Sequence, residues 1–107
     1  MFFKTNELEW ENVGENIDRQ IVGFDDHLMM VVVRFKKGAV GYLHQHFHSQ
    51  ATYIADGIFE VTIENQIETL IKGDSFFVTS NNLHGVVCVE DGILVDVFNP
   101  KREDFLK

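Results

Sequence analysis

The chain has 107 residues, of which 45% are hydrophobic and 24% are charged. This length is enough for one hydrophobic core, and this composition excludes a disordered chain. Seventeen acidic against nine basic residues give a net charge of −8, and the basic residues are scattered, so we expect no nucleic-acid partner. The apolar runs are far shorter than the roughly 18 residues that span a bilayer, and the first residues lack a signal-peptide core. We therefore expect residues 1–107 to form a single cytoplasmic domain with no membrane partner.

Short apolar and β-branched runs, separated by turn residues, predict an all-β fold. We expect strands at residues 19–24, 28–36, 40–46, 51–55, 58–64, 67–71, 75–79, 86–90 and 93–98. Their number and near-regular spacing indicate a sandwich or a jelly roll, and periodicity alone does not choose between the two. The first eighteen residues carry no clear period.

Three local features add to this pattern. Asp-Gly pairs at 56–57 and 91–92 each predict a two-residue hairpin, because both central residues of such a turn need positive φ. The tail from Pro100 to Lys107 is either a short helix started by its proline or an ordered strap. Cys88 is the only cysteine, so no internal disulfide forms, and we expect it to be a buried apolar filler.

Three of the five histidines, His44, His46 and His48, lie two residues apart in a segment expected to be a strand, so their side chains share one face. Each histidine taken alone has a plain explanation as a solvated or hydrogen-bonded side chain. Together, three imidazoles on one short strand would repel one another if charged and would leave hydrogen-bonding groups unused if buried. A metal ion uses neutral imidazole directly, so the cluster predicts a metal site.

A shared metal ion requires the chain to bend after these histidines. Gln50 has the same parity, but a fully extended chain places it about 20 Å from His44, at roughly 3.3 Å per residue. With ligand bonds of about 2.0–2.2 Å, one ion contacts both residues only if the chain bends or bulges around residues 47–49. His84 would complete the site from a separate strand after the Asn81-Asn82 pair, which tolerates turn geometry.

A second polar feature interrupts the last expected strand. Asp96 lies within an apolar run, and period 2 places it on the same face as Leu94 and Phe98. A carboxylate on an inward face costs free energy unless it is paired or used, so Asp96 either faces water or has a functional role. Arg102 follows as either a planar fork for a substrate carboxylate or one of the scattered surface cations.

These residues resemble the two sequence motifs of the cupin superfamily. The first motif, Gly-x5-His-x-His-x3-4-Glu-x6-Gly, fits at every spacing, with Gln in place of Glu, at Gly38, His44, His46, Gln50 and Gly57. The second, Gly-x5-Pro-x-Gly-x2-His-x3-Asn, fits Gly73 and His84 and has other residues at its remaining positions, namely Thr79, Asn81 and Cys88. Asn81 replaces a glycine, and asparagine is able to adopt the left-handed conformation.

The cupin resemblance implies an all-β jelly-roll barrel, a double-stranded β-helix, with one divalent metal ion. Its ligands would be His44, His46, Gln50 and His84, with His48 beside them or, in the alternative, as a substitute ligand. An amide oxygen brings no charge, so the ion would keep a formal +2 charge and act as a stronger Lewis acid. A neutral ligand set favours polarisation of a substrate oxygen over oxygen chemistry, and Fe, Ni, Zn, Co and Mn all stay open as the ion.

Nearly the whole chain also resembles the KdgF family, the small cupins of pectin degradation. The residues that carry this resemblance are Trp10-Glu11, 25–31, 38–41, His44 to Gln50, Thr52-Tyr53, Gly57 with Phe59-Glu60, 73–75, His84-Gly85 and the ending from Asp96 to Leu106. The resemblance implies a metal-dependent, isomerase-like enzyme of carbohydrate metabolism. Its substrate would be a 4,5-unsaturated monouronate, released from pectin or alginate, which it would convert to the linear keto form by ring opening and tautomerisation.

The KdgF resemblance also implies roles for the last strand and the tail. Asp96 would move the proton, Arg102 would hold the substrate carboxylate and Phe98 would line the pocket. It further implies a homodimer, for which exposed edge strands are the expected contact.

Three other functions stay open from the sequence. Another small metal cupin, such as a dioxygenase or a sugar isomerase, would use the same ligands. A non-catalytic sugar-binding barrel would bind without turnover, although metal ligands are superfluous in such a module. A structural barrel with incidental histidines would bind no metal.

Overall fold

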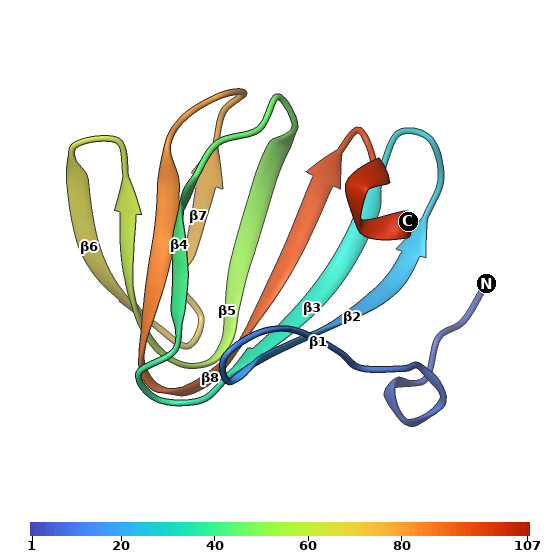
Figure 1. The fold of residues 1–107 in the computed structure, drawn as a ribbon, viewed down its shortest axis with the longest axis horizontal. Coiled ribbons are helices and arrows are strands. Elements are labelled where there is room, and N and C mark those ends of the chain that lie inside the picture. Colours follow the sequence, from blue (N-terminus) through green and yellow to red (C-terminus); the bar gives the residue numbers. More distant parts are fainter.

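The computed structural model describes residues 1–107, which form an antiparallel β-barrel with two short 3-10 helices (Figure 1). Neither helix has the length and apolar character to cross a membrane. The elements in chain order are η1 (Thr5–Glu7), β1 (Glu11–Gly14), β2 (Ile17–Phe24), β3 (Met29–Phe35), β4 (Val40–His44), β5 (Ser49–Ile63), β6 (Gln66–Ile71), β7 (Ser75–Val78), β8 (His84–Asn99) and η2 (Glu103–Leu106).

Two long strands, β5 and β8, run through both layers of the barrel and pair with each other along most of their length. The first half of β5 pairs with β7 and with the second half of β8, which continues the layer through β3, β2 and β1. The second half of β5 pairs with β6 and with the first half of β8, which in turn pairs with β4. The fold is a jelly roll, which confirms the fold that the cupin resemblance implies.

The prediction of two hairpins at the Asp-Gly pairs is wrong. Asp56-Gly57 lies inside β5 and Asp91-Gly92 lies inside β8, where the two strands cross from one layer to the other. The register between them shifts on both sides of Asp56 and again after Ile58. A glycine with positive φ serves a β-bulge as well as a turn, and Gly57 has φ 84°. Each Asp-Gly pair therefore bends one long strand instead of separating two short ones.

The remaining elements agree closely with the sequence pattern. Five expected strands are present with small shifts of their ends, and the two bulges join the other four expected segments into β5 and β8. Strand β1 was not predicted, because residues 11–14 lack a hydrophobic period, and the first three of them are exposed. The tail does form a short helix, although it begins at Glu103 and not at Pro100.

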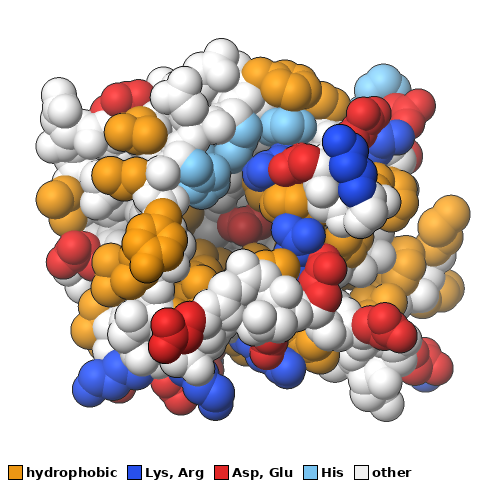
Figure 2. Space-filling model, viewed as in Figure 1, with side chains coloured by type: hydrophobic (Ala, Val, Ile, Leu, Met, Phe, Trp, Pro, Cys, Tyr) orange, Lys and Arg blue, Asp and Glu red, His pale blue; other side chains and the backbone are white.

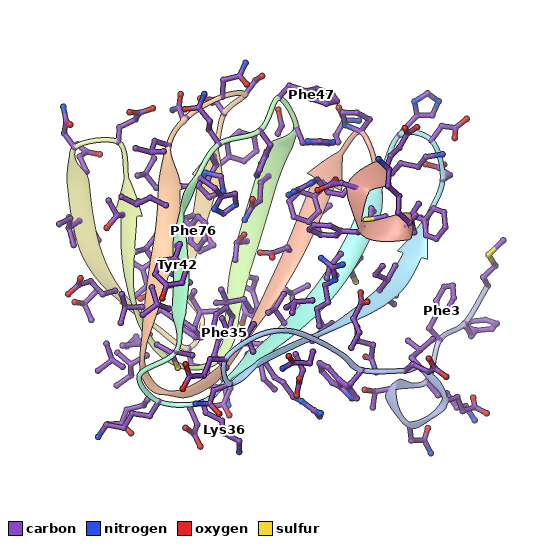
Figure 3. The ribbon with its side chains drawn as sticks, in the orientation of Figure 1. Phe3, Phe35, Lys36, Tyr42, Phe47 and Phe76 are labelled. Atoms are coloured by element: carbon purple, nitrogen blue, oxygen red, sulfur yellow. The ribbon has the colours of Figure 1, made fainter.

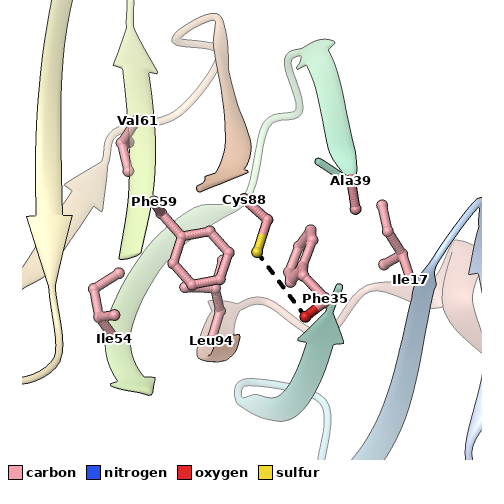
Figure 4. Packing of buried hydrophobic residues seen from close by; sticks show 8 residues of the cluster. All are labelled: Ile17, Phe35, Ala39, Ile54, Phe59, Val61, Cys88 and Leu94. Atoms are coloured by element: carbon pink, nitrogen blue, oxygen red, sulfur yellow. Dashed lines mark hydrogen bonds between the residues drawn. The ribbon is translucent and has the colours of Figure 1, made fainter. Parts of the chain in front are cut away.

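Apolar side chains from both layers fill one end of the barrel (Figure 4). The rings of Phe35 and Phe59 meet edge to face, with centroids 5.2 Å apart. Cys88 is 1% exposed, and burial raises the pKa of its thiol, which confirms it as a core filler. Figure 3 places Phe35 and Lys36 toward this end and Phe47 at the opposite end. Polar inward side chains gather at the Phe47 end.

Gly57 and Gly92 are in contact at the strand crossing, and this contact generates a stability prediction. A Cβ atom at Gly57 would lie 2.5 Å from the Asp91 carbonyl oxygen and from the Gly92 Cα, both backbone atoms. We expect Gly57→Ala to lower the free energy of unfolding by about 2 to 5 kcal/mol, since strain from positive φ adds to a backbone clash. Urea denaturation measures this loss.

Gly38→Ala is the matched control, because Gly38 has φ 88° but a Cβ there would meet nothing within 4 Å. We expect this variant to lose only about 1 to 2 kcal/mol, from the backbone conformation alone. Equal losses for the two variants would contradict the close crossing of β5 and β8.

Candidate metal centre

Three histidines converge at the Phe47 end of the barrel. One ring nitrogen from each of His44, His46 and His84 lies within 4.8 Å of the others. The ring centroids of His44 and His84 are 4.3 Å apart, and those of His46 and His84 are 4.8 Å apart. His44 on β4 and His84 on β8 are register partners, so strand pairing itself brings these two residues together.

Each of these rings is oriented by a backbone carbonyl two residues away. The Nδ1-to-oxygen pairs are His44 with Tyr42 at 2.8 Å, His46 with His48 at 3.0 Å and His84 with Asn82 at 2.9 Å. A carbonyl oxygen only accepts, so Nδ1 carries the proton in each ring and Nε2 keeps a free lone pair. Histidines that bind metals commonly donate from their other nitrogen in this way.

The environment of His46 and His84 favours the neutral form of both imidazoles. Burial lowers the pKa of His84 to about 4, with further lowering from the neighbouring histidines and Arg102. Burial and the charge of Arg102 also lower the pKa of His46. Nε2 of His84 is buried and has no hydrogen-bond partner. An orphaned buried acceptor costs free energy unless a cation or donor meets it, so this atom fits a metal ligand.

Gln50 presents its amide oxygen to the same centre. The amide Nε2 of Gln50 donates to Thr52 Oγ1 at 2.9 Å and to Asp96 Oδ1 at 3.3 Å. This turns the amide Oε1 of Gln50 toward His46, where it lies 3.1 Å from the ring Nε2. With His46 protonated on Nδ1, both of these facing atoms are acceptors, an arrangement that a shared cation stabilises. Three neutral nitrogens and one neutral oxygen fit a divalent metal ion. The structure therefore brings all four predicted ligands together.

The chain bends where a shared metal requires it. Strand β4 ends at His44 and β5 begins at Ser49, and residues 45–48 lie outside any strand, which confirms the expected bend. The backbone N–H of Asn81 donates to the carbonyl oxygen of His46 at 2.7 Å and ties this loop to the turn before β8. Asn81 has φ 66°, which confirms the expected left-handed conformation.

His48 lies beside the centre and outside the cluster of three. Its ring stacks on Phe47 with centroids 4.0 Å apart, and the residue is 7% exposed. Burial, then the charge of Arg102, lowers its pKa. Its contact with the centre is its backbone carbonyl, which orients His46. This position favours a supporting role over that of a substitute ligand.

A cavity of about 170 Å³ adjoins the histidines. His44, Gln50 and His84 line it together with the inward residues of the last strand and tail, and Asp96 is its only acidic residue. Figure 2 shows a hollow on this face with histidine side chains at its edge and an acidic side chain inside it. The cavity therefore joins three of the four predicted ligands and the predicted catalytic residues in one site.

Asp96 faces this cavity and not open water. Thr52 donates to its Oδ1 at 2.6 Å, in addition to the contact from Gln50. Burial raises the pKa of Asp96 to about 6, although Thr52, Arg102 and Gln50 each lower it in part. A carboxyl group with this pKa is able to accept and return a proton near neutral pH. We did not assign Thr52 a role from the sequence, although its parity with Gln50 on β5 was a usable signal.

Phe98 and Arg102 line the same cavity. The Phe98 ring is 2% exposed and lies 5.8 Å from that of His46. Arg102 is 9% exposed, and its guanidinium lies 5.0 Å from the Phe98 ring and 4.2 Å from the Phe105 ring. Nε and Nη2 of Arg102 donate to Asp104 at 3.1 and 2.8 Å. Arg102 is thus a buried cation of the site, and no sequence pattern predicts its contacts with Phe105 and Asp104.

A jelly-roll barrel with histidines from both motifs and one amide in a cavity defines the cupin class of proteins. The cupin domain family matches residues 31–98 of this chain. An oxalate decarboxylase of Bacillus subtilis, studied for its Mn(II) centres, is 23% identical with a TM-score of 0.84, over 95% of this chain and 30% of that one. At that identity the likeness concerns the fold alone.

Three further proteins are similar along nearly the whole chain. The pectin degradation protein KdgF of Dickeya dadantii (strain 3937) is 47% identical over 98% of this chain and 97% of its own length. The structure of KdgF from Halomonas sp. is 40% identical with a TM-score of 0.95, covering 98% of this chain and 97% of that one. An RmlC-like cupin from Shewanella frigidimarina NCIMB 400 is 46% identical with a TM-score of 0.95, covering 97% and 94%. The chain belongs to the KdgF family of cupins.

The ligand geometry predicts one metal ion per chain. We expect His84→Ala to weaken metal binding by more than about 100-fold, because removing a ligand costs more than the 10- to 100-fold loss typical of a supporting contact. Calorimetric titration of the metal-free protein with Co²⁺ or Zn²⁺ measures the affinity for the metal ion. His27→Ala is the control, since His27 is exposed and outside the cluster, and it should bind as wild type does. Wild-type affinity in His84→Ala would contradict the proposed ligand set.

The pKa of Asp96 predicts how the stability of the metal-free protein depends on pH. Its folded pKa of about 6 lies above the ordinary value of 3.8, so its contribution to stability is full below pH 3.8 and is lost as the pH rises through 6. We expect the melting temperature of Asp96→Asn, relative to wild type, to increase steadily between pH 4 and pH 7. Thermal melts in chelator measure this difference, and a constant difference would mean that the carboxyl group is not desolvated.

Proposed function

We propose that this protein is a cytoplasmic isomerase that converts 4,5-unsaturated monouronates, released from pectin or alginate, to their linear keto forms. Membership of the KdgF family supports the substrate class. The observation that carries the proposal is the placement of Asp96, a desolvated carboxyl group, in the same cavity as three of the four candidate metal ligands, His44, Gln50 and His84. The cavity, at about 170 Å³, is smaller than the roughly 300–1,000 Å³ of drug-sized sites and suits one sugar ring.

The reaction is a relocation of one proton within the substrate. The anomeric hydroxyl loses its proton, the bond between carbon 1 and the ring oxygen breaks to leave an aldehyde at carbon 1, and the enolate left at carbon 5 takes one proton at carbon 4 to become a ketone. Atoms and electrons balance without any co-reactant. Asp96 would accept the first proton as a carboxylate and return it to carbon 4 as the acid. Thr52 and Gln50 hold its Oδ1 by hydrogen bonds, so the carboxyl group is fixed in position for both steps.

A divalent metal ion bound by His44, His46, Gln50 and His84 would supply Lewis-acid polarisation of a substrate oxygen. Gln50 contacts Asp96 through its amide N–H, so the same side chain would orient the proton-transfer residue and contribute a ligand. Phe98 walls the cavity and excludes water from it, and Arg102 supplies the local cation that an anionic substrate needs on a protein of net charge −8.

The reaction removes the conjugated double bond of a lyase-generated monouronate. Its progress is therefore measured directly as loss of absorbance near 230 nm. We expect wild-type protein to accelerate the decay above the buffer rate and Asp96→Asn to lower that acceleration by about 100-fold or more, as removal of a proton-transfer group does. Removal of the metal ion with a chelator should also abolish the acceleration. A metal titration of Asp96→Asn shows whether this variant still binds the metal ion. Decay at the buffer rate with metal bound would exclude this substrate.

We further propose that the protein forms a homodimer through an apolar area on the outer surface of the sheet. The side chains of Tyr53 and Phe77 lie on the outer surface of the sheet and are 50% and 58% exposed. They adjoin Val95 and Val97 on β8, and no charged residue lines the groove among them. An exposed apolar patch without charge favours association, and a two-fold dimer uses the same patch on both copies.

The face and the edge of the sheet are distinguishable as dimer contacts. Phe77 is on the proposed face, whereas Ile67 is an equally exposed apolar residue on the edge strand β6. We expect Phe77→Lys to shift the protein to a monomer in sedimentation velocity runs and Ile67→Lys to leave the dimer intact. The opposite result would support the edge-strand contact that the sequence suggested.

A further inference from the structure

A second arginine lines the cavity of the candidate site. Arg19 lies on β2 with the same inward parity as Ile17 and Ile21, and it borders the cavity that also contains His84, Asp96 and Arg102. The sequence offered no motif for it, because it is one of nine scattered cations.

Arg19 and Arg102 are held by one aromatic ring. The guanidinium carbon of Arg19 lies 3.9 Å from the centroid of Phe105, and that of Arg102 lies 4.2 Å from the same centroid. Phe105 belongs to η2 and packs against Phe98 with centroids 5.7 Å apart. Figure 1 shows η2 beside the ends of β2 and β3, where the tail folds back over the barrel. The tail therefore fixes both cations at the mouth of the cavity.

Each of the two arginines forms an ion pair with an acid that is more exposed than the arginine itself. Arg19 pairs with Glu11 at 2.6 Å, and their side chains are 17% and 50% exposed. Arg102 pairs with Asp104 at 2.8 Å, and their side chains are 11% and 55% exposed. Neither acid lines the cavity, whereas both arginines do. The two basic residues thus border the cavity while the acids face solvent.

Arg19 has more unused hydrogen-bond donors than Arg102. A guanidinium carries five N–H donors. Arg102 gives its Nε and one Nη2 proton to Asp104, which occupies one edge of its fork. Arg19 gives only its Nε proton, to Glu11, so both of its terminal amino groups are free. A free terminal edge on a fixed guanidinium matches the two oxygens of a carboxylate.

We propose that Arg19 forms a carboxylate-binding subsite of this cavity, sharing the substrate carboxylate with Arg102. The proposal rests on the uronate function proposed above and assigns recognition of the carboxylate to two cations where the family resemblance implied one. Glu11 orients Arg19, Asp104 orients Arg102, and Phe105 keeps both guanidinium planes in place. This arrangement supplies the local attraction that the net negative charge of the chain lacks.

Steady-state kinetics with the unsaturated monouronate test this role through Arg19→Gln. Arg34→Gln is the matched control, because Arg34 also pairs with an acid, Asp18, and also covers an aromatic ring, Trp10, but does not line this cavity. Loss of a charge-assisted hydrogen bond should raise KM by about 10- to 100-fold in Arg19→Gln, with kcat changed far less. The control should keep the wild-type KM. Equal KM values in the two variants would overturn the subsite.

A binding measurement separates this proposal from the proposed function. Calorimetry compares galacturonate with its uncharged methyl ester, neither of which needs to react. Wild-type protein should prefer the acid, and Arg19→Gln should reduce that preference about tenfold, whether or not the unsaturated monouronate is turned over. An unchanged preference, or equal losses for acid and ester, would overturn the subsite. Arg19→Lys keeps the charge and the packing stem, so an intermediate preference there confirms that a loss in Arg19→Gln is not misfolding.

Discussion

The site depends on one repeated interaction, the hydrogen bond from an imidazole Nδ1 to a backbone carbonyl two residues away. It occurs at His44, His46 and His84 and leaves three Nε2 lone pairs directed to one place. Because backbone carbonyls make these contacts, the orientation of the rings is set by the path of the main chain. Desolvation then keeps the buried rings neutral, as the lowered pKa values of His46 and His84 indicate. The ligand set is thus built before a metal ion binds.

The barrel architecture supplies the main-chain path on which this interaction depends. Strands β5 and β8 carry Gln50, Asp96 and His84, and they pass through both layers because bulges at Gly57 and Gly92 bend them. A pair of ordinary hairpins at those positions would divide each strand and separate the residues. Register partners across the crossing then fix Gln50 opposite Phe98 and Thr52 opposite Asp96. The hydrogen bonds among Gln50, Thr52 and Asp96 follow from that register.

Much of this site was predictable from the sequence, and the reasons are local. Motif spacing indicated the four candidate ligands, and the length of an extended chain required the bend before Ser49. The strand expected over the histidines ends at His44, so period 2 alone would not have placed His46. The Asp-Gly pairs misled because a glycine serves a strand crossing as well as a turn. Gly57 has positive φ in its bulge, whereas Gly92 lacks it and instead allows a close approach, since a Cβ there would lie 2.6 Å from the Asp56 carbonyl oxygen. The contacts of Arg19, Phe105 and Asp104 depend on how the tail folds back over β2, which no periodic signal in residues 100–107 describes.

Long-range ¹⁵N–¹H NMR correlation of the histidine rings in chelated protein at pH 7 tests the account most directly. It reports, for each ring, which nitrogen carries the proton. The structure predicts that His44, His46 and His84 each carry a proton on Nδ1, and that the buried rings of His46 and His84 are neutral. A charged ring at His46 or His84, or a neutral ring protonated on Nε2, would contradict a metal centre that is built by the fold before the ion arrives.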